Sequence, residues 1–173
     1  VYDKIANEYD VIYDGNGATI GETAKSHHIY DQESNLSRNN FFKVGNTFLG
    51  WSEDANATTA TYGDNAVVKN LTTSGEITLY AIWQPKPYYV SYDANTGTGN
   101  MSNSTHYYGV ASSLSKNVFE KTGYTFGGWY YNADLTETAT NEAIPAHNFS
   151  LYAWWKEENK PSEKKDSRKK EEV

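Results

Sequence analysis

Four histidines and a few paired carboxylates are the residues of this chain whose types could support acid–base chemistry or metal binding. His27 and His28 are adjacent in the sequence, which is not the i, i+4 spacing of a helical metal-binding pair. Paired carboxylates such as Glu53 and Asp54 fall in predicted loops, whereas glycoside hydrolysis needs two carboxylates that face each other across a cleft. We therefore expect all four histidines to be solvated strand or loop residues. We also expect no catalytic residue, no metal site and no cofactor.

Two acidic turns resemble the start of a calcium-binding loop. The segment from Asp93 to Gly97 reads Asp-Ala-Asn-Thr-Gly, but the position where a bidentate Glu would close such a loop is Ser104. The segment 14–17 reads Asp-Gly-Asn-Gly and occupies the same place earlier in the chain. Asn-Gly and Asp-Gly steps favour positive φ angles, so we interpret both segments as tight hairpin turns.

Exposed aromatic side chains are the one feature of the sequence with binding potential. Tyr130, Tyr131 and Trp154 fall outside the predicted core faces of their strands. Such rings stack on sugars or anchor a protein partner, and we take these three as candidate ligand-contact residues. The alternative, that they pack against neighbouring elements of the same chain, stays open.

The elements that position these residues occur twice, with a period of about 70–80 residues that suits a small domain. Three pairs of segments carry the repetition: 9–14 with 88–93, 45–51 with 123–129, and 79–83 with 151–155. The offset between copies is 79 and 78 residues for the first two pairs and 72 for the third, so most of the length difference falls between the second and third segments. We therefore predict a variable surface loop at 52–75 in the first copy and at 132–149 in the second.

Strand periodicity predicts a core rich in large aromatic residues. The closing segments alternate, which places Leu79, Ala81 and Trp83 on one face. In the central segments a Phe and a Trp lie three apart, on opposite faces of a regular strand. A bulge at the glycine between them would turn both toward one core. The predicted core residues are Phe48, Trp51, Trp83, Phe126, Trp129 and Trp155.

A short helix is expected between the opening and central strands of each copy. Leu36 and Phe41 are five residues apart, as are Leu114 and Phe119, and the stretches between them are rich in Ser and Asn. This spacing fits a short helix, or a turn that docks two anchors, better than it fits a strand.

The repetition and composition together predict the domain organisation. We expect a first module at 1–84, a stiff Pro linker at 85–87, a second module at 88–156 and a charged, disordered spacer at 157–173. The net charge of −7 and the acidic body argue against nucleic-acid binding. No apolar run approaches the roughly 20 residues of a membrane span, and without Cys a thiol nucleophile is excluded. The chain begins with Val rather than Met, so we read it as part of a longer protein.

The second copy resembles the Listeria–Bacteroides repeat, the B-repeat type of internalin B. The matching motifs are TGYTFGGW at 122–129 and LYAWW at 151–155, after a strand that ends in an Asn/Gly turn. The first copy departs from the pattern at Asn46, where the family usually has Tyr. The resemblance implies a β-rich α+β fold: two tandem β-grasp-like (ubiquitin-like) modules, each a mixed sheet with one short helix.

The same resemblance implies a function without catalysis. Such repeats serve as stalk or adhesion modules of secreted or cell-surface proteins of bacteria, here suggesting a Gram-positive cell wall. We expect an extracellular, monomeric repeat region that binds no nucleic acid and does not insert into membranes. The alternative is a carbohydrate- or host-protein-binding module that uses exposed Trp and Tyr side chains.

Overall fold

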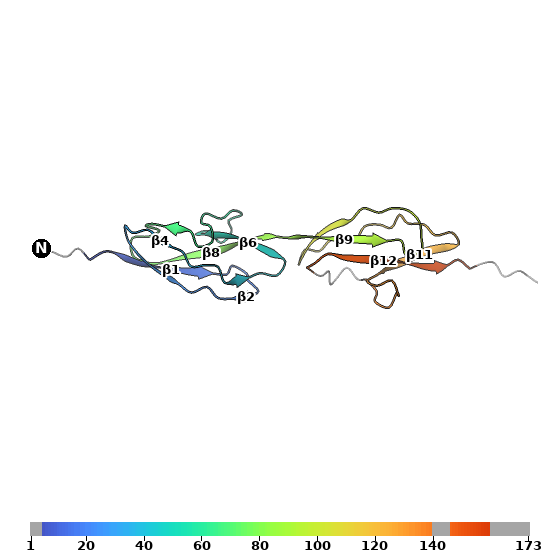
Figure 1. The fold of residues 1–173 in the computed structure, drawn as a ribbon, viewed down its shortest axis with the longest axis horizontal. Helices are drawn as coiled ribbons and strands as arrows, with labels where there is room; N and C mark the ends of the chain where they lie inside the picture. The colour runs from blue at the N-terminus through green and yellow to red at the C-terminus, as the bar shows by residue number, and fades with distance from the viewer. Residues whose placement is uncertain (1–4, 140–145, 160–173) are drawn as a thin grey trace, which may run out of the picture. The chain divides into compact units, whose positions relative to one another are not determined.

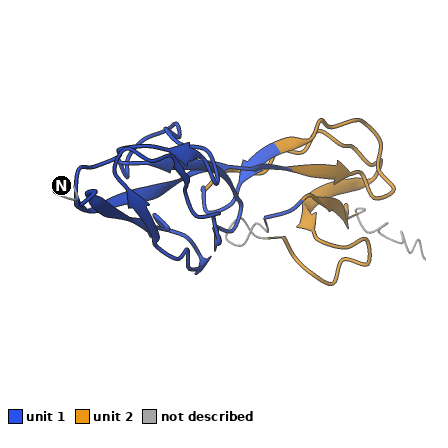
Figure 2. Cartoon of the chain, turned by 60° about the vertical axis from the view of Figure 1, so that its left-hand side comes forward, with its two compact units in different colours: residues 1–88, 105–110, 144–147 blue, residues 89–104, 111–143, 148–173 orange. Residues whose placement is uncertain are grey.

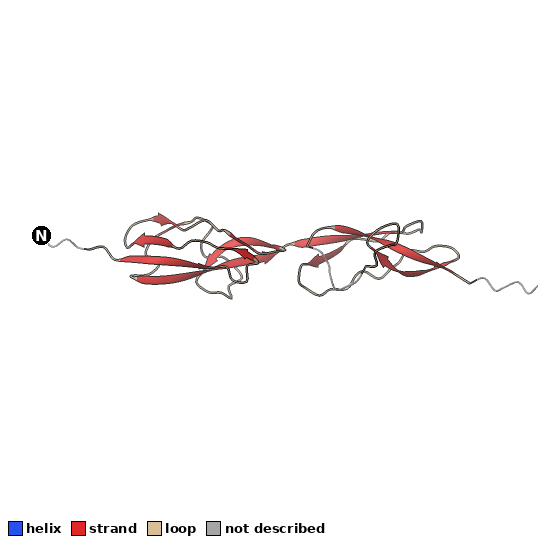
Figure 3. Ribbon diagram, turned by 90° about the horizontal axis from the view of Figure 1, so that it is seen from below, coloured by secondary structure: helices blue, strands red, loops and turns tan. Residues whose placement is uncertain are grey.

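The computed structural model describes residues 5–139 and 146–159, and every regular element in this part of the chain is a β-strand (Figure 3). The strands are β1 (Glu8–Asp14), β2 (Ile20–Gly21), β3 (Ser26–Ile29), β4 (Ser34–Asn35), β5 (Phe41–Phe42), β6 (Asn46–Ser52), β7 (Val67–Val68), β8 (Gly75–Pro85), β9 (Pro87–Asp93), β10 (Ser104–Tyr107), β11 (Tyr124–Tyr130) and β12 (Phe149–Glu157).

Each repeat is built on a four-stranded sheet with the same strand order. The first sheet runs β3-β1-β8-β6 and the second β10-β9-β12-β11. In both, the first and last long strands of the repeat are neighbours and run parallel, and the last strand pairs antiparallel with the strand that carries the Gly-Trp motif. Figure 1 shows β1 beside β8 and β9 beside β12. The first repeat adds two small sheets, β2-β5 and β4-β7.

Alternation of side chains along the opening strands forms the core. Tyr9, Val11 and Tyr13 on β1 are buried, as are their counterparts Tyr88 and Val90 on β9. The residues between them are exposed or only half-buried, which is the period-2 pattern of a strand with one face on a core. The sequence-based assignment of these opening strands is confirmed.

The predicted glycine bulges are also present. The antiparallel register shifts between Phe48 and Gly50 on β6, and between Phe126 and Gly128 on β11. Because of the extra residue, the Phe and the Trp of each strand point into the same core. Phe48 and Trp51 have ring centroids 4.9 Å apart, and the equivalent pair in β11 has the same separation.

The remaining predicted core residues differ in burial. Trp51 is fully buried and Trp129 nearly so. Trp83 and Trp155 are half-buried, and each donates its indole N–H to a carbonyl of the turn that follows the opening strand, Gly15 O and Ala94 O, both at 2.8 Å. These two tryptophans therefore join the closing strand to the opening turn of their own repeat.

The α+β, β-grasp-like prediction is wrong, because the expected short helices are absent from the described residues. Asn39 helps to explain why the helix expected between Leu36 and Phe41 does not form. Its side chain accepts the N–H of Phe41 and donates to the carbonyl of the same residue. The Leu36 N–H bonds to Ala66 O, far along the chain. Ser and Asn side chains offer the backbone such alternatives to helical bonding. The buried Leu36 is thus docked by an irregular segment that ends in β5.

The second repeat repeats this arrangement. Asn117 bonds both backbone groups of Phe119, at 2.9 and 3.1 Å, and Phe119 is buried. The Ser115 N–H donates to the hydroxyl of Tyr92, as Ser37 N–H donates to the hydroxyl of Tyr13. Local Asn bonds and long-range bonds to a Tyr hydroxyl therefore take the place of helical hydrogen bonds in both copies.

The chain divides into two compact units, shown in Figure 2, of which the first comprises 1–88, 105–110 and 144–147 and the second the rest. β8 extends through Pro85 and β9 begins at Pro87, so Lys86 is the one residue of the predicted linker outside a strand. β12 ends at Glu157. The predicted spacer lies outside the described residues from 160 onward.

Candidate interaction surface on the second repeat

The outward side of β12 carries a small group of aromatic side chains. Leu151 and Ala153 are fully buried, so Tyr152 and Trp154 lie on the opposite face, where both are half-buried. Tyr130 is the partner of Tyr152 on β11, and its ring centroid lies 6.2 Å from that of Trp154 in an edge-on arrangement. We call Tyr130, Tyr152 and Trp154 the aromatic face.

A glycine allows Trp154 to lie against the sheet. A Cβ added at Gly127, the extra residue of the β11 bulge, would overlap the six-membered ring of Trp154. A Cβ at Gly128, the residue paired with Trp154, would meet nothing within 4 Å. The indole therefore occupies the space that a side chain at Gly127 would otherwise fill.

The structure separates the three sequence-predicted contact residues. Tyr130 and Trp154 lie together, whereas Tyr131 packs against Phe149 with ring centroids 5.7 Å apart. Tyr152 was not among the predicted contacts, although the alternation of the closing strand already places it on the outward face. That alternation was the signal that could have found it.

The first repeat has no such surface at the same positions. Its counterpart of Trp154 is Ile82, which pairs with Gly50 and is only 2% exposed. The segment after β6 returns over this glycine: a Cβ at Gly50 would meet Ala60 Cβ, and the Trp51 N–H bonds to Tyr62 O at 2.7 Å. The aromatic face is therefore a property of the second repeat.

A cavity of about 650 Å³ lies in the second repeat. Its described lining offers side-chain hydroxyl, amide and ammonium groups over apolar rings, and none of these described residues supplies a carboxylate or imidazole that could act as a general acid or base. The described lining residues are Ser113, Leu114, Ser115, Lys116, Asn117, Phe126, Trp129 and Ala139.

The prediction that the histidines are solvated is wrong for His28 and His106, each 1% exposed. His28 stacks on Tyr9, and its Nε2 and Nδ1 hydrogen-bond with the hydroxyls of Ser26 and Ser34 at 2.6 and 2.5 Å. His106 stacks in the same way on Tyr88. Burial lowers the pKa of both imidazoles, because the charged form loses solvation. Both are core residues, and both ring nitrogens of His28 are hydrogen-bonded.

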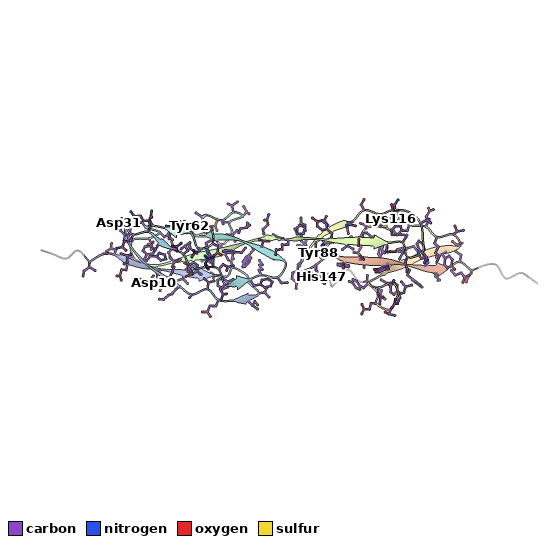
Figure 4. The ribbon with its side chains drawn as sticks, in the orientation of Figure 1. Asp10, Asp31, Tyr62, Tyr88, Lys116 and His147 are labelled. Carbon is purple, nitrogen blue, oxygen red and sulfur yellow. The ribbon has the colours of Figure 1, made fainter. Side chains whose placement is uncertain are left out.

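His27 is exposed and lies beside an ion pair formed by Asp10 and Lys25. Its imidazole lies 2.8 Å from Oδ1 of Asp10, and the other carboxylate oxygen of Asp10, Oδ2, accepts a bond from Lys25 at 2.8 Å. These two hydrogen bonds lower the pKa of Asp10, which is labelled in Figure 4. His147 is exposed. In the described residues no group of three or more His, Cys, Asp or Glu side chains is placed to hold a metal ion.

The two acidic segments are turns, but the tight hairpins predicted there are wrong, because β1 and β9 pair with β3 and β10, which begin only at Ser26 and Ser104. Asp14 and Asp93 each accept the backbone N–H two residues ahead, at 2.7 Å, so their carboxylates are used within the turn. Asn16 and Asn95, which donate those bonds, have φ angles of 47° and 43°.

Among residues 5–139 and 146–159 there is no helix long and apolar enough to cross a membrane.

Comparison with known proteins identifies the repeat. Residues 9–82 and 88–154 each match the Listeria-Bacteroides repeat domain. A "Putative Gly-rich membrane protein" of Evansella cellulosilytica is 33% identical over 152 residues, which cover 86% of this chain and 17% of that protein. A "Putative membrane protein" of the same organism is 36% identical over 115 residues, covering 65% of this chain and 16% of its own length. The chain spans less than a fifth of these relatives. Because the repeat domain matches most of the sequence in two successive copies, this chain belongs to the Listeria-Bacteroides repeat family.

Proposed function

We propose that the chain is a non-enzymatic spacer within a longer bacterial protein at the cell surface. One observation carries the proposal: the first and last strands of each repeat are adjacent and parallel. The chain therefore enters the sheet of a repeat at one end and leaves it at the other. A repeat with this connection adds length between the segments on either side of it.

The relatives support a cell-surface setting, and the composition supports a spacer role. Two long proteins named as membrane proteins contain the matching region as a small part of their length. The acidic balance and the many polar side chains suit a surface that faces water. On this proposal the repeat region is extracellular and monomeric, binds no nucleic acid and converts no substrate.

Labelling of intact cells tests the setting. Antibodies raised against the two-repeat chain should label intact bacteria that express the parent protein, and external protease should remove the signal. An antibody against a cytoplasmic protein of the same cells serves as the control and should label only permeabilised cells. Repeat labelling that also requires permeabilisation would exclude the surface setting.

A binding role is the second candidate, and the aromatic face favours it. Tyr130, Tyr152 and Trp154 lie within one patch of the outward side of β11 and β12 and are not fully buried. Grouped rings of this kind stack on sugars or anchor protein partners. The proposed partner is therefore a glycan or a host-surface protein.

A matched pair of substitutions tests this second candidate. Tyr152→Ala should abolish saturable binding to a glycan or host-protein panel, while Tyr80→Ala, at the same position of the first repeat, should leave it unchanged. Absence of saturable binding by the folded parent chain would contradict the binding role. Sedimentation of the same samples would show whether the chain is a monomer.

A further inference from the structure

We infer that each repeat is a mechanical clamp that resists tension applied along the chain. The inference begins with the direction of the two terminal strands. In the first repeat, six residues of β1, from Tyr9 to Asp14, align in parallel with Gly75 to Tyr80 of β8. Tension on the chain pulls β1 toward its amino end and β8 toward its carboxyl end. Because the strands are parallel, these pulls slide one strand along the other.

Sliding loads the hydrogen bonds of the ladder together. In a parallel pair the bonds are evenly spaced along both strands, so no single bond carries the force first. An antiparallel pair pulled at one end opens instead one residue pair at a time. Resistance to force depends on the barrier to unfolding, and breaking several bonds in one step raises that barrier.

Two side-chain bonds extend the clamp past the end of the ladder. The Asn16 side chain donates to Ala81 O at 2.9 Å, and the Trp83 indole donates to Gly15 O at 2.8 Å. Both bonds join the turn after β1 to β8. The second repeat has the same two bonds, from Asn95 to Ala153 O at 3.0 Å and from Trp155 to Ala94 O at 2.8 Å.

The buried faces of the strands add resistance of a different kind. Tyr9, Val11 and Tyr13 of β1 share one core cluster with Leu79 and Ala81 of β8. Moving β1 along β8 by one residue would direct these side chains toward the opposite face of the sheet. The ladder cannot slip without first disrupting the core.

The second clamp is shorter than the first. Four residues of β9, from Val90 to Asp93, align with Phe149 to Tyr152 of β12. The hydroxyl pair of Ser91 and Ser150, 2.7 Å apart, links the same strands. With fewer aligned pairs, the second repeat should unfold at a lower force than the first.

Force spectroscopy on the two-repeat chain tests the clamp by comparing directions of pull. The sequence has no Cys, so attachment points can be chosen freely. Ile5→Cys with Lys86→Cys pulls the first repeat along its clamp through two exposed residues. Thr47→Cys with Gln84→Cys, exposed partners in the antiparallel β6–β8 pair, peels the same repeat open. The first geometry should need a rupture force several times that of the second, and equal forces would overturn the proposal.

Two asparagines at positive φ provide matched variants. Asn16→Gly removes the bond to Ala81 O across the clamp and a second bond to Ala55 O, whereas Asn70→Gly removes two bonds to Asp31, both outside the clamp. Their φ angles are 47° and 55°, which Gly adopts without strain. In the Ile5–Lys86 geometry, Asn16→Gly should lower the rupture force and Asn70→Gly should leave it close to that of the parent. An equal decrease in rupture force in both variants would show that Asn16 does not strengthen the clamp.

Pulling both repeats in series tests their order. With Ile5→Cys and Glu158→Cys, two unfolding events are expected, and Asn95→Gly should weaken the lower-force event alone. A shift of the higher-force event instead would overturn the order. The clamp follows from strand order, and its use in the cell rests on the proposed spacer function. A low rupture force would exclude the clamp and leave surface labelling unaffected, while absent surface labelling would leave the measured force unchanged.

Discussion

The six-membered ring of Trp154 occupies the space into which a side chain at Gly127 would project. The equivalent positions of the first repeat hold different side chains, with Leu49 in place of Gly127 and Ile82 in place of Trp154. A large ring beside a glycine in one copy corresponds to two medium-sized side chains in the other. The two positions are therefore coupled in volume across the β11–β12 pair.

This coupling predicts the outcome of a double-mutant cycle. Gly127→Leu alone should destabilise the second repeat by about 1–3 kcal/mol, because the new side chain collides with the indole. Adding Trp154→Ile should recover part of the loss, with a coupling energy of about 0.5–3 kcal/mol. Urea denaturation of the four proteins measures these terms. Strictly additive effects would show that the two side chains do not compete for space.

The indole bonds of the closing strands predict the effect of a conservative change. Trp155→Phe keeps an aromatic ring but removes the N–H that donates to Ala94 O. The carbonyl then keeps only its bond from the Gly97 N–H, and loss of the indole bond should cost about 0.5–1.5 kcal/mol. Trp154→Phe is the matched control, because Trp154 lies on the outward face of the same strand, and it should cost less. Equal losses in free energy of unfolding would contradict the structural role of Trp155.

Buried histidines make the stability of the repeats depend on pH in the mildly acidic range. Burial holds the pKa of His28 and His106 below the ordinary value of an imidazole, so the unfolded chain binds protons at these sites more readily than the folded chain. Their contribution is therefore complete above the unfolded pKa and decreases as the pH falls below it. The melting temperature should fall between pH 7.5 and 5.

Substitution of the imidazoles tests this assignment. His28→Gln and His106→Gln together should flatten the dependence of melting temperature on pH in that window. The lowered pKa of Asp10 acts in a more acidic range, because stability from a carboxylate is lost only as the pH falls below its ordinary pKa. His27→Gln, at an exposed site, is the control and should retain most of the slope. An unchanged slope in the double variant would exclude the buried histidines as its cause.

Local patterns in the sequence were enough for the long strands. Alternation identified β1 and the faces of β12, and the glycine between Phe48 and Trp51 identified a bulge, because each depends on residues a few positions apart. The short strands were beyond such reasoning. β4 and β7 have two residues each and exist only through pairing between Ser34–Asn35 and Val67–Val68.

The wrong predictions of a helix and of a solvated His28 also arose because the structure there depends on residues far apart in the sequence. Five-residue spacing between Leu36 and Phe41 fits both a helix turn and the irregular segment that is present, and the choice depends on a bond to the distant Ala66. His28 appeared to be a strand residue open to solvent, but its hydroxyl partner Ser34 lies on another strand. The aromatic face shows the same limit, since equivalent positions hold a half-buried Trp154 and a buried Ile82.

A close approach of two backbone segments makes Gly21 irreplaceable in the first repeat. Gly21 has a φ of 100°, and a Cβ there would collide with the carbonyl oxygen of Asn40. Gly21→Ala should therefore destabilise the first repeat by about 1–3 kcal/mol through backbone strain, with a further loss from disruption of the β2–β5 pair. Gly63→Ala is the control, because a Cβ at Gly63 meets nothing within 4 Å and its φ is not in the positive region. Thermal unfolding of both variants measures the difference. A Gly21→Ala protein as stable as the Gly63→Ala protein would show that β2 and β5 do not approach each other this closely.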